Sequence, residues 1–220
     1  MKAVLEFLKD LEQNNNRDWF ALNKNRYEDA KAQHEALVTD ILARVAKWDS
    51  SIADLQAKDC TYRIYRDVRF SKDKSPYKTT MGALVGKGGR KAQGAINYVH
   101  IEPGKSFVAG GSYMPESAGL KAIRQEIDYN LDEFLGIINA PAFVKHFGAL
   151  EAEWKGKLPP KGYAADNPAI EWLKYKSYIG TQQFTDKQII ASDFAAKADE
   201  TLQLLKPFND FINRALRTEE

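Results

Sequence analysis

One stretch of the chain combines arginines, lysines, acids and aromatic rings at a spacing that suits the recognition of an anion. It reads Tyr62-Arg63-Ile-Tyr-Arg66-Asp67-Val-Arg69-Phe70-Ser-Lys-Asp73-Lys74-Ser-Pro76-Tyr77-Lys78. A guanidinium group presents a planar fork of N–H donors to a phosphate or a carboxylate, and lysine and tyrosine add single donors. We therefore predict that a small phosphorylated or carboxylated ligand is bound by Arg63, Arg66, Asp67, Arg69, Lys74, Tyr77 and Lys78.

The charge balance of the surrounding segment supports this prediction. Residues 58–91 contain ten cationic and three acidic side chains, so this segment carries a net charge of +7. The whole chain carries +2, which leaves −5 for the remainder. Because three acids cannot neutralise ten cations, the segment is expected to present a surface that attracts anions.

We expect residues 62–70 to form a β-strand, whose side chains alternate between two faces. Arg66 then shares the core face with Ile64 and Val68, where a guanidinium group needs a carboxylate or an anionic ligand as its partner. The candidate carboxylates lie on other predicted elements and are Glu102, Glu126 and Asp128.

Asp67 falls on the opposite face of this predicted strand, between Arg63 and Arg69. Nearby cations favour the ionised form of a carboxyl group, so Asp67 is expected to orient the two arginines. The segment shows no nucleophile paired with a base. We therefore name no reaction, and the sequence leaves open whether the protein is an enzyme.

The basic segment also resembles a known family signature. Arg63-x-x-Arg66-Asp67-x-Arg69-Phe70 followed by Asp73-Lys74-x-x-Tyr77 is similar to the signature of an uncharacterised, mainly bacterial family, domain of unknown function 2461. Further blocks resemble the same family over nearly the whole chain, at residues 14–20, 98–103, 110–115 and 162–168. The resemblance implies no established activity, cofactor or partner.

Helical periodicity predicts the elements at both ends of the chain. Residues 2–13 and 17–48 read as helices, separated by Asn14–Asn16 as a breaker and cap, with a further break near residues 23–25. Helices are also expected at 119–138, at 141–147 with Pro141 in the first turn, and at 168–174. Two closing helices, 191–205 and 207–216, are expected to be separated by Pro207.

The middle of the chain reads as strands. Residues 62–70, 81–86, 95–102 and 105–111 are rich in β-branched and aromatic residues, and 177–184 is expected to join the sheet edge. Glu102-Pro103-Gly104-Lys105 has the composition of a hairpin turn. The order of elements predicts an α+β fold, a central antiparallel β meander flanked by N-terminal and C-terminal helices, in a single domain over residues 1–220.

Composition bounds the remaining predictions. The single cysteine, Cys60, cannot form an internal disulfide, and the first ten residues contain Glu6 and Asp10 where a signal peptide needs an apolar core. We expect a cytoplasmic protein with no membrane partner. The three histidines lack metal-ligand spacing, so no metal and no cofactor are predicted, and His100 is expected to be a hydrogen-bonded structural histidine.

Two other functions fit the same segment. Tyr62, Tyr65, Phe70 and Tyr77 alternate with cations, as in surfaces that stack single-stranded nucleic acid, so a nucleic-acid-binding module is the first alternative. An interaction or scaffold domain, in which the arginines and aspartates form a structural network of ion pairs, is the second.

Overall fold

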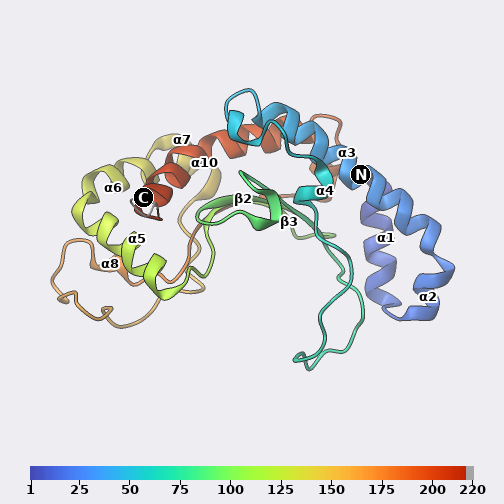
Figure 1. The fold of residues 1–220 in the computed structure, drawn as a ribbon, viewed down its shortest axis with the longest axis horizontal. Helices are drawn as coiled ribbons and strands as arrows, with labels where there is room; N and C mark the ends of the chain where they lie inside the picture. Colours follow the sequence, from blue (N-terminus) through green and yellow to red (C-terminus); the bar gives the residue numbers. More distant parts are fainter. Residues whose placement is uncertain (217–220) are drawn as a thin grey trace. The chain divides into compact units, whose positions relative to one another are not determined.

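The computed structural model describes residues 1–216 (Figure 1). Five helical elements precede the first strand: α1 (Lys2–Gln13), α2 (Arg17–Leu22), α3 (Lys24–Val45), the 3-10 turn η1 (Ser50–Ile52) and α4 (Ala57–Cys60). The middle of the chain holds β1 (Met81–Val85), the 3-10 turn η2 (Gly89–Lys91), β2 (Ile96–Ile101) and β3 (Ser106–Ser112). The rest forms α5 (Ser117–Tyr129), α6 (Leu131–Ile138), α7 (Pro141–Phe147), α8 (Ile170–Leu173), β4 (Tyr178–Phe184), α9 (Asp186–Ile190) and α10 (Phe194–Leu216).

The strands form one four-stranded antiparallel sheet in the order β1-β2-β3-β4. The turn between β2 and β3 is the predicted hairpin, with the Lys105 N–H donating to the Glu102 carbonyl at 3.0 Å. Gly104 has a φ of +73°, which only glycine adopts without strain at this position of the turn. With helices at both ends of the chain, the structure confirms the α+β class and the meander.

The chain divides into two compact units. Unit 1 contains Met1–Ala92, Tyr98–Val108 and Gln183–Glu200, and unit 2 contains the described residues of Gln93–Asn97, Ala109–Gln182 and Thr201–Glu220. The single domain expected for residues 1–220 stays a prediction. No helix within residues 1–216 is both long and apolar enough to cross a membrane.

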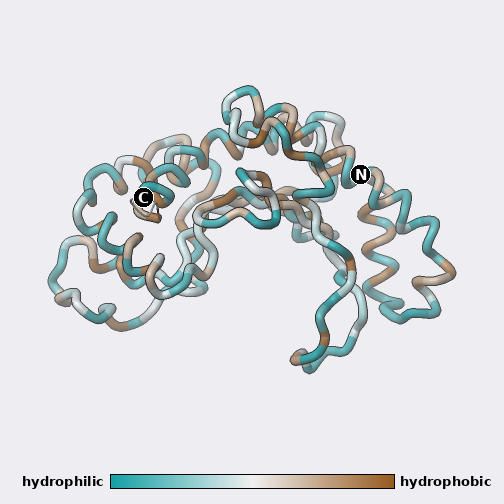
Figure 2. The backbone as a smooth tube through the Cα atoms, viewed as in Figure 1, coloured by the Kyte–Doolittle hydropathy of each residue, from teal (hydrophilic) through white to brown (hydrophobic). Residues whose placement is uncertain are grey.

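Unit 1 is built on the packing of α1 against α3. The apolar residues of α1 recur on one face, and Figure 2 shows hydrophobic and hydrophilic positions mixed along these helices. Asn16 caps α2 as predicted, because its side-chain oxygen accepts the Trp19 N–H at 2.9 Å. The expected break near residues 23–25 is also present, since Asn23 ends α2 and precedes α3.

Unit 2 has its own core, centred on Phe134 of α6. This ring is fully buried and packs against Trp172, Phe208 and Phe211, with centroid distances of 5.4–6.5 Å.

The predicted helix over 119–138 is wrong in one respect. It ends at Tyr129, and Asn130 separates α5 from α6 with its N–H on the Glu126 carbonyl.

The prediction that Pro207 separates two closing helices is wrong. α10 runs from Phe194 to Leu216 with Pro207 inside it. Proline removes one backbone hydrogen bond from a helix. The helix continues because side chains on both sides of the proline are fully buried, and this burial stabilises both halves; they are Leu202, Leu205, Phe208 and Ile212.

The predicted strand over residues 62–70 is also wrong. These residues and the segment that follows form a long loop that doubles back on itself, which we call the arm (residues 62–80); in Figure 1 it is the teal loop that follows α4. Its two sides meet only at isolated points, such as the antiparallel bridge between Tyr65 and Tyr77. Pro76 has no N–H to donate, and side chains near the tip take the backbone groups that a ladder would use.

We expect Phe134→Ala to lower the free energy of unfolding by about 3–5 kcal/mol, because it leaves a cavity among rings that cannot close over it. Urea unfolding followed by circular dichroism measures the change. Tyr129→Ala is the matched control, because Tyr129 is 74% exposed, and it should change stability by less than about 0.5 kcal/mol. Equal losses in the two variants would contradict the assignment of Phe134 to the core.

Candidate functional site

The arm is anchored to the N-terminal helices through Tyr77. The Tyr77 ring stacks on the ring of Phe20 with centroids 4.0 Å apart and planes 13° apart. Asn15 bonds both backbone groups of Tyr77: its amide donates to the carbonyl at 2.9 Å, and its oxygen accepts the N–H at 3.1 Å. Tyr77 is 6% exposed. These contacts fix where the arm leaves the body of unit 1.

Arg66 does not lie on a core face as predicted, because residues 62–70 form no strand. Its guanidinium group forms an ion pair with Asp73 and also donates to the Ser75 carbonyl at 3.3 Å. Its partner is therefore an acid of the same arm. The predicted candidates bond elsewhere: Glu102 to His100, Glu126 to Arg214, and Asp128 to Asn167.

Asp73 is held in a dense set of hydrogen bonds. Ser75 donates to it twice, from its hydroxyl at 2.6 Å and from its N–H at 2.9 Å. The bonds from Ser75, followed by the bond from Arg66, hold the pKa of the Asp73 carboxyl far below its usual range. Arg66 and Asp73 thus neutralise each other and close the turn of the arm.

Asp67 bonds Arg69, its neighbour two residues along the arm. The Arg69 guanidinium donates to both oxygens of Asp67 at 2.6–3.2 Å, and this bonding lowers the pKa of Asp67. Asp67 thus bonds Arg69, which is one of the two arginines that it was expected to orient. Lys74 instead donates to the Val68 carbonyl at 2.9 Å. These residues shape the exposed tip of the arm.

A hollow of about 450 Å³ lies beside the arm, and we call it the motif hollow. Of the predicted residues it contains Arg66, Tyr77 and Lys78. Its two cations face two acids, Glu12 and Asp73, so its lining is neutral overall. The complete lining is Glu12, Asn15, Arg66, Asp73, Ser75, Tyr77, Lys78, Thr79 and Thr80.

A second hollow, of about 250 Å³, has a different charge, and we call it the basic pocket. Residues of α3 form one part of its lining, and residues from α4, the arm, β1 and η2, together with Thr61, form the rest. It carries four cations and one acid, Glu35, which lies 4.0 Å from Lys31. The complete lining is Tyr27, Lys31, His34, Glu35, Lys58, Thr61, Tyr62, Arg63, Ile64, Met81 and Arg90.

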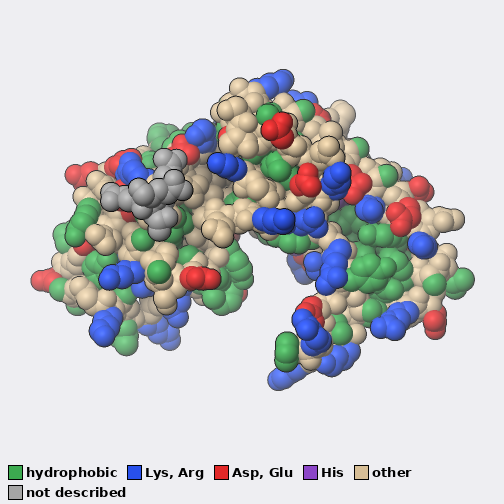
Figure 3. Space-filling view, viewed as in Figure 1, with side chains coloured by type: hydrophobic (Ala, Val, Ile, Leu, Met, Phe, Trp, Pro, Cys, Tyr) green, Lys and Arg blue, Asp and Glu red, His purple; other side chains and the backbone are tan. Residues whose placement is uncertain are grey.

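Two of the predicted residues belong to the basic pocket or lie beside it. Arg63 lines it, and Lys78 places its Nζ 5.2 Å from the centre of the Tyr62 ring, which also lines it. Burial, with a smaller effect of Arg63, lowers the pKa of Lys78. Figure 3 shows Lys and Arg side chains gathered along the arm. The structure therefore separates the predicted set: Arg66, Asp67, Arg69 and Lys74 pair within the arm, while Arg63 lies in the basic pocket.

The sequence prediction missed Lys31, His34, Lys58 and Arg90 as site residues. The last two were counted in the cation excess, but nothing placed them near Arg63. Tyr27, Lys31 and His34 are spaced four and three residues apart, so they share one face of α3. That spacing is a signal in the sequence. It becomes informative only when the opposite wall of the pocket is known.

Arg90 is held in position by close backbone packing. Its Nε donates to the Asp59 carbonyl at 3.2 Å. Gly89 before it has a φ of +55°, and a Cβ at Gly89 would lie 2.5 Å from the same carbonyl oxygen. Only glycine allows this approach. The turn therefore fixes Arg90 beside α4.

His34 lies almost completely buried on α3, with 3% of its surface exposed. Its Nε2 is buried and has no hydrogen-bond partner within residues 1–216. Burial lowers the pKa of His34 to about 4, so the imidazole is neutral at pH 7. His34 thus contributes a neutral residue to the lining of the basic pocket, while its Nε2 has almost no accessible surface.

His100 is a hydrogen-bonded structural histidine, as predicted. Its Nδ1 lies 3.2 Å from the Tyr98 hydroxyl, its Nε2 lies 2.9 Å from Glu102, and its ring stacks on Phe107.

Cys60 is fully buried, and burial raises the pKa of its thiol to about 11. It therefore stays protonated at neutral pH and is a weak nucleophile.

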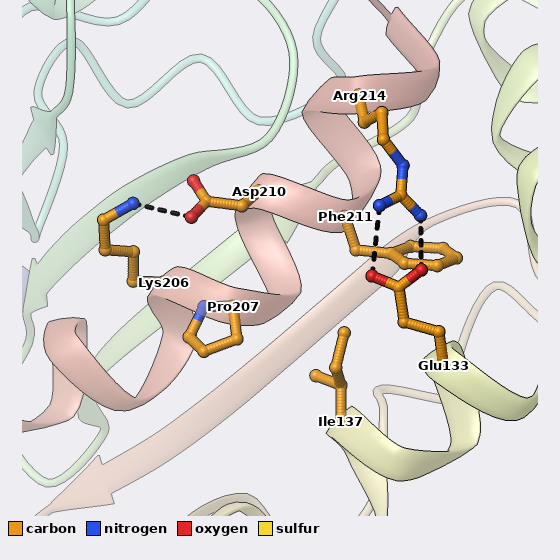
Figure 4. A pocket seen from close by; sticks show the side chains of 7 residues that line it. All are labelled: Glu133, Ile137, Lys206, Pro207, Asp210, Phe211 and Arg214. Carbon is orange, nitrogen blue, oxygen red and sulfur yellow. Dashed lines mark hydrogen bonds and ion pairs between the residues drawn. The ribbon is translucent and has the colours of Figure 1, made fainter. Parts of the chain in front are cut away.

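Unit 2 has a hollow of about 570 Å³ between α6 and α10, shown in Figure 4. Its charges pair with one another: Arg214 bonds both carboxylate oxygens of Glu133 at 2.7–3.1 Å, and Lys206 bonds Asp210 at 2.6 Å. These pairs leave no free charge for a ligand. Within the described residues, no group of three or more His, Cys, Asp or Glu is placed to hold a metal ion.

The anchoring of the arm predicts unequal effects at two neighbouring sites. Tyr77→Ala should lower the free energy of unfolding by about 3–4 kcal/mol, because it removes a buried ring from its stack on Phe20. Arg66→Ala should cost under about 1 kcal/mol, since its partner Asp73 is well exposed and water can solvate it. Denaturant unfolding measures both. A loss of several kcal/mol in Arg66→Ala would show that this ion pair is essential to the fold.

The buried imidazole predicts a pH dependence. His34 has a pKa near 6.5 in the unfolded chain and about 4 in the folded one, so the unfolded state binds more protons between these values. Stability should therefore fall as pH is lowered from 6.5, by about 3 kcal/mol in total at pH 4. We would compare wild type with His34→Leu by urea unfolding from pH 7 to pH 4. A difference that stays constant with pH would contradict the burial of His34.

The chain has a family match over most of its length. A family model described as "Conserved hypothetical protein (DUF2461)" matches residues 3–211. No curated protein and no solved structure compared with the chain matches it. The match covers both units, the arm and the basic pocket, and it agrees with the resemblance seen in the sequence. The chain belongs to the DUF2461 family of conserved hypothetical proteins.

Proposed function

We propose that the protein binds a small anionic ligand, phosphorylated or carboxylated, in the basic pocket. The observation that carries this proposal is the charge of its lining, four cations against one acid. Lys58, Arg63 and Arg90 form no ion pair within residues 1–216, and all three are exposed. Cations that lack a carboxylate partner attract an anion because no internal ion pair has to break first.

The paired arginines of the arm are poorer candidates. Arg66 would have to leave Asp73, and Arg69 would have to leave Asp67, before either could bind a ligand. Each exchange replaces one charge-assisted bond by another and gains little. We therefore assign Arg66, Asp67, Arg69, Lys74 and Tyr77 to the construction of the arm. Of the predicted residues, Arg63 contacts the ligand, and Lys78 lies beside the pocket next to the Tyr62 ring.

The pocket supplies both kinds of donor that an oxyanion needs. Arg63 and Arg90 present guanidinium forks, and Lys58 adds a point charge. The bond from Arg90 to Asp59 uses its Nε and leaves the terminal nitrogens for a ligand. A volume of 250 Å³ lies just below the usual range of ligand pockets, which favours a compact ligand.

A nucleic-acid-binding module remains the first alternative. Phe70 at the tip of the arm is 96% exposed, and the Arg69 guanidinium lies 5.9 Å from the centre of its ring. Tyr77, however, is buried against Phe20 and offers no stacking surface. The scaffold alternative is supported by the two internal pairs, Arg66–Asp73 and Arg69–Asp67, and it leaves the unpaired cations of the basic pocket without a role.

The cytoplasm is the proposed location. This follows from the predicted lack of disulfides and agrees with the burial of the single cysteine, Cys60, as a free thiol.

The proposal predicts which arginines control affinity for phosphate. Isothermal titration with inorganic phosphate should show that Arg63→Ala and Arg90→Ala each weaken binding by about tenfold or more, because each removes a charge-assisted hydrogen bond. The matched control is Arg69→Ala. It removes the same charge from a paired, exposed arginine and should weaken binding less than twofold.

Salt dependence separates this proposal from the nucleic-acid alternative. Binding in a compact pocket depends weakly on salt, whereas a nucleic acid that contacts many phosphates loses affinity steeply. Equal weakening by all three substitutions, or tight binding of single-stranded DNA with a steep salt slope and loss in Phe70→Ala, would contradict the proposal.

A further inference from the structure

Another hollow of unit 1 adjoins the basic pocket, and we call it the apolar hollow. Its volume is about 480 Å³, which is within the usual range of ligand pockets. Most of its lining is apolar and comes from α3, from η1 and from the start of α4, with Leu42, Ile52 and Leu55 as its largest apolar residues. Two charged residues belong to the lining, Glu35 and Lys58, and both also line the basic pocket.

One row of side chains on α3 runs from the basic pocket into the apolar hollow. Its members are spaced four residues apart and are Lys31, Glu35, Thr39 and Ala43. The first two line the basic pocket, and the last three line the apolar hollow. The row extends over about 18 Å of helix. The two hollows are therefore neighbours along the same face of α3.

The opposite wall follows the chain in the same way. Leu55 and Lys58 line the apolar hollow, and Lys58 and Arg63 line the basic pocket. At the junction Lys58 is exposed and Glu35 is half-buried, so both residues have surface that a ligand can contact. The hollows are consecutive parts of one groove along α3, with a cationic end and an apolar end.

The apolar end offers surface that a ligand can reach. Ala43 on one wall and Ala53 on the other are exposed. Ala46 and Leu55 are half-buried in the same lining. Alanine side chains are small, so they leave this end of the groove open. Because water on such a surface is released when hydrocarbon covers it, the apolar end favours a hydrocarbon group.

A groove with charge at one end and apolar surface at the other fits an amphiphile. We propose, on the basis of the proposed function, that the ligand is an anionic amphiphile with a single hydrocarbon chain. Its oxyanion head binds Arg63 and Arg90 in the basic pocket, and its chain passes Lys58 into the apolar hollow. The basic pocket, at about 250 Å³, has room for a compact head, so a chain extends beyond it. The methylene stem of Lys58 can cover the chain at the junction while its ammonium group stays in water.

A series of n-alkyl phosphates tests this inference. Inorganic phosphate, n-butyl phosphate and n-octyl phosphate share the head and differ in the chain. Isothermal titration of the wild-type protein with the monomeric ligands should show an affinity that rises with each added methylene group, by up to about fourfold per group. Octyltrimethylammonium has the same chain and a cationic head. It should bind about tenfold more weakly than octyl phosphate, or less, because the cations of the basic pocket repel its head.

The variant Ala43→Phe separates the two ends of the groove. Ala43 is exposed, so the fold should tolerate a ring that occupies part of the apolar hollow. We expect octyl phosphate to lose about tenfold in affinity, while inorganic phosphate binds as it does to the wild type. The matched control Ala21→Phe places the same ring at an exposed position of α2, outside both hollows, and should leave both affinities unchanged.

Two results would overturn the inference and leave the proposed function intact. One is equal affinity of the wild type for inorganic phosphate and octyl phosphate. The other is a preference for the chain that persists in Ala43→Phe, because the chain would then lie outside the apolar hollow. If neither inorganic phosphate nor an alkyl phosphate binds, the proposed function itself fails, and the inference with it. The chain-length series on the wild type decides the matter even if Ala43→Phe folds poorly.

Discussion

The stack of Tyr77 on Phe20 is the contact on which the position of the arm depends. An isolated two-stranded loop with few ladder hydrogen bonds is not stable on its own, and the arm has only scattered pairing between its two sides. The stacked rings, with both backbone groups of Tyr77 bonded to Asn15, supply the missing constraint. The Lys78 N–H then donates to the Ile64 carbonyl at 2.7 Å, which brings the residue next to Arg63 into register.

Ion pairing divides the cations of the arm into two groups with different consequences. At the tip, Asp67 and Asp73 pair with arginines a few residues away, and these pairs shape a loop that has no core of its own. Exposed pairs of this kind contribute little to stability. Where the arm meets α3 and α4, Arg63 forms no ion pair within residues 1–216, and Asp67 acts on it only through a smaller electrostatic effect. Three of the ten cations of residues 58–91, namely Lys58, Arg63 and Arg90, therefore line the basic pocket without an ion-pair partner within residues 1–216.

His34 is a polar side chain on the buried face of α3. Most of the buried side chains of α3, such as Val38, Ile41 and Leu42, are apolar and stabilise the packing of the helix. An imidazole on the same buried face, with one nitrogen unpaired, opposes folding by about 1–3 kcal/mol. Proteins break local rules of this kind mainly where a ligand or a reaction requires it. The apolar neighbours on α3 offset this unfavourable group.

The sequence by itself determined most of the element types, the α+β meander, the hairpin at Gly104 and the cap at Asn16, because these depend on periodicity, turn chemistry and capping within a few residues. It also located the cation excess. Only the tertiary structure decided that residues 62–70 form a loop, that α10 continues through Pro207, and that Arg66 pairs with Asp73. It alone placed Lys31, His34 and Arg90 beside Arg63. Strand formation needs a neighbouring strand, helix continuity at a proline needs a core on both sides, and a pocket needs walls from distant segments. No local pattern carries that information.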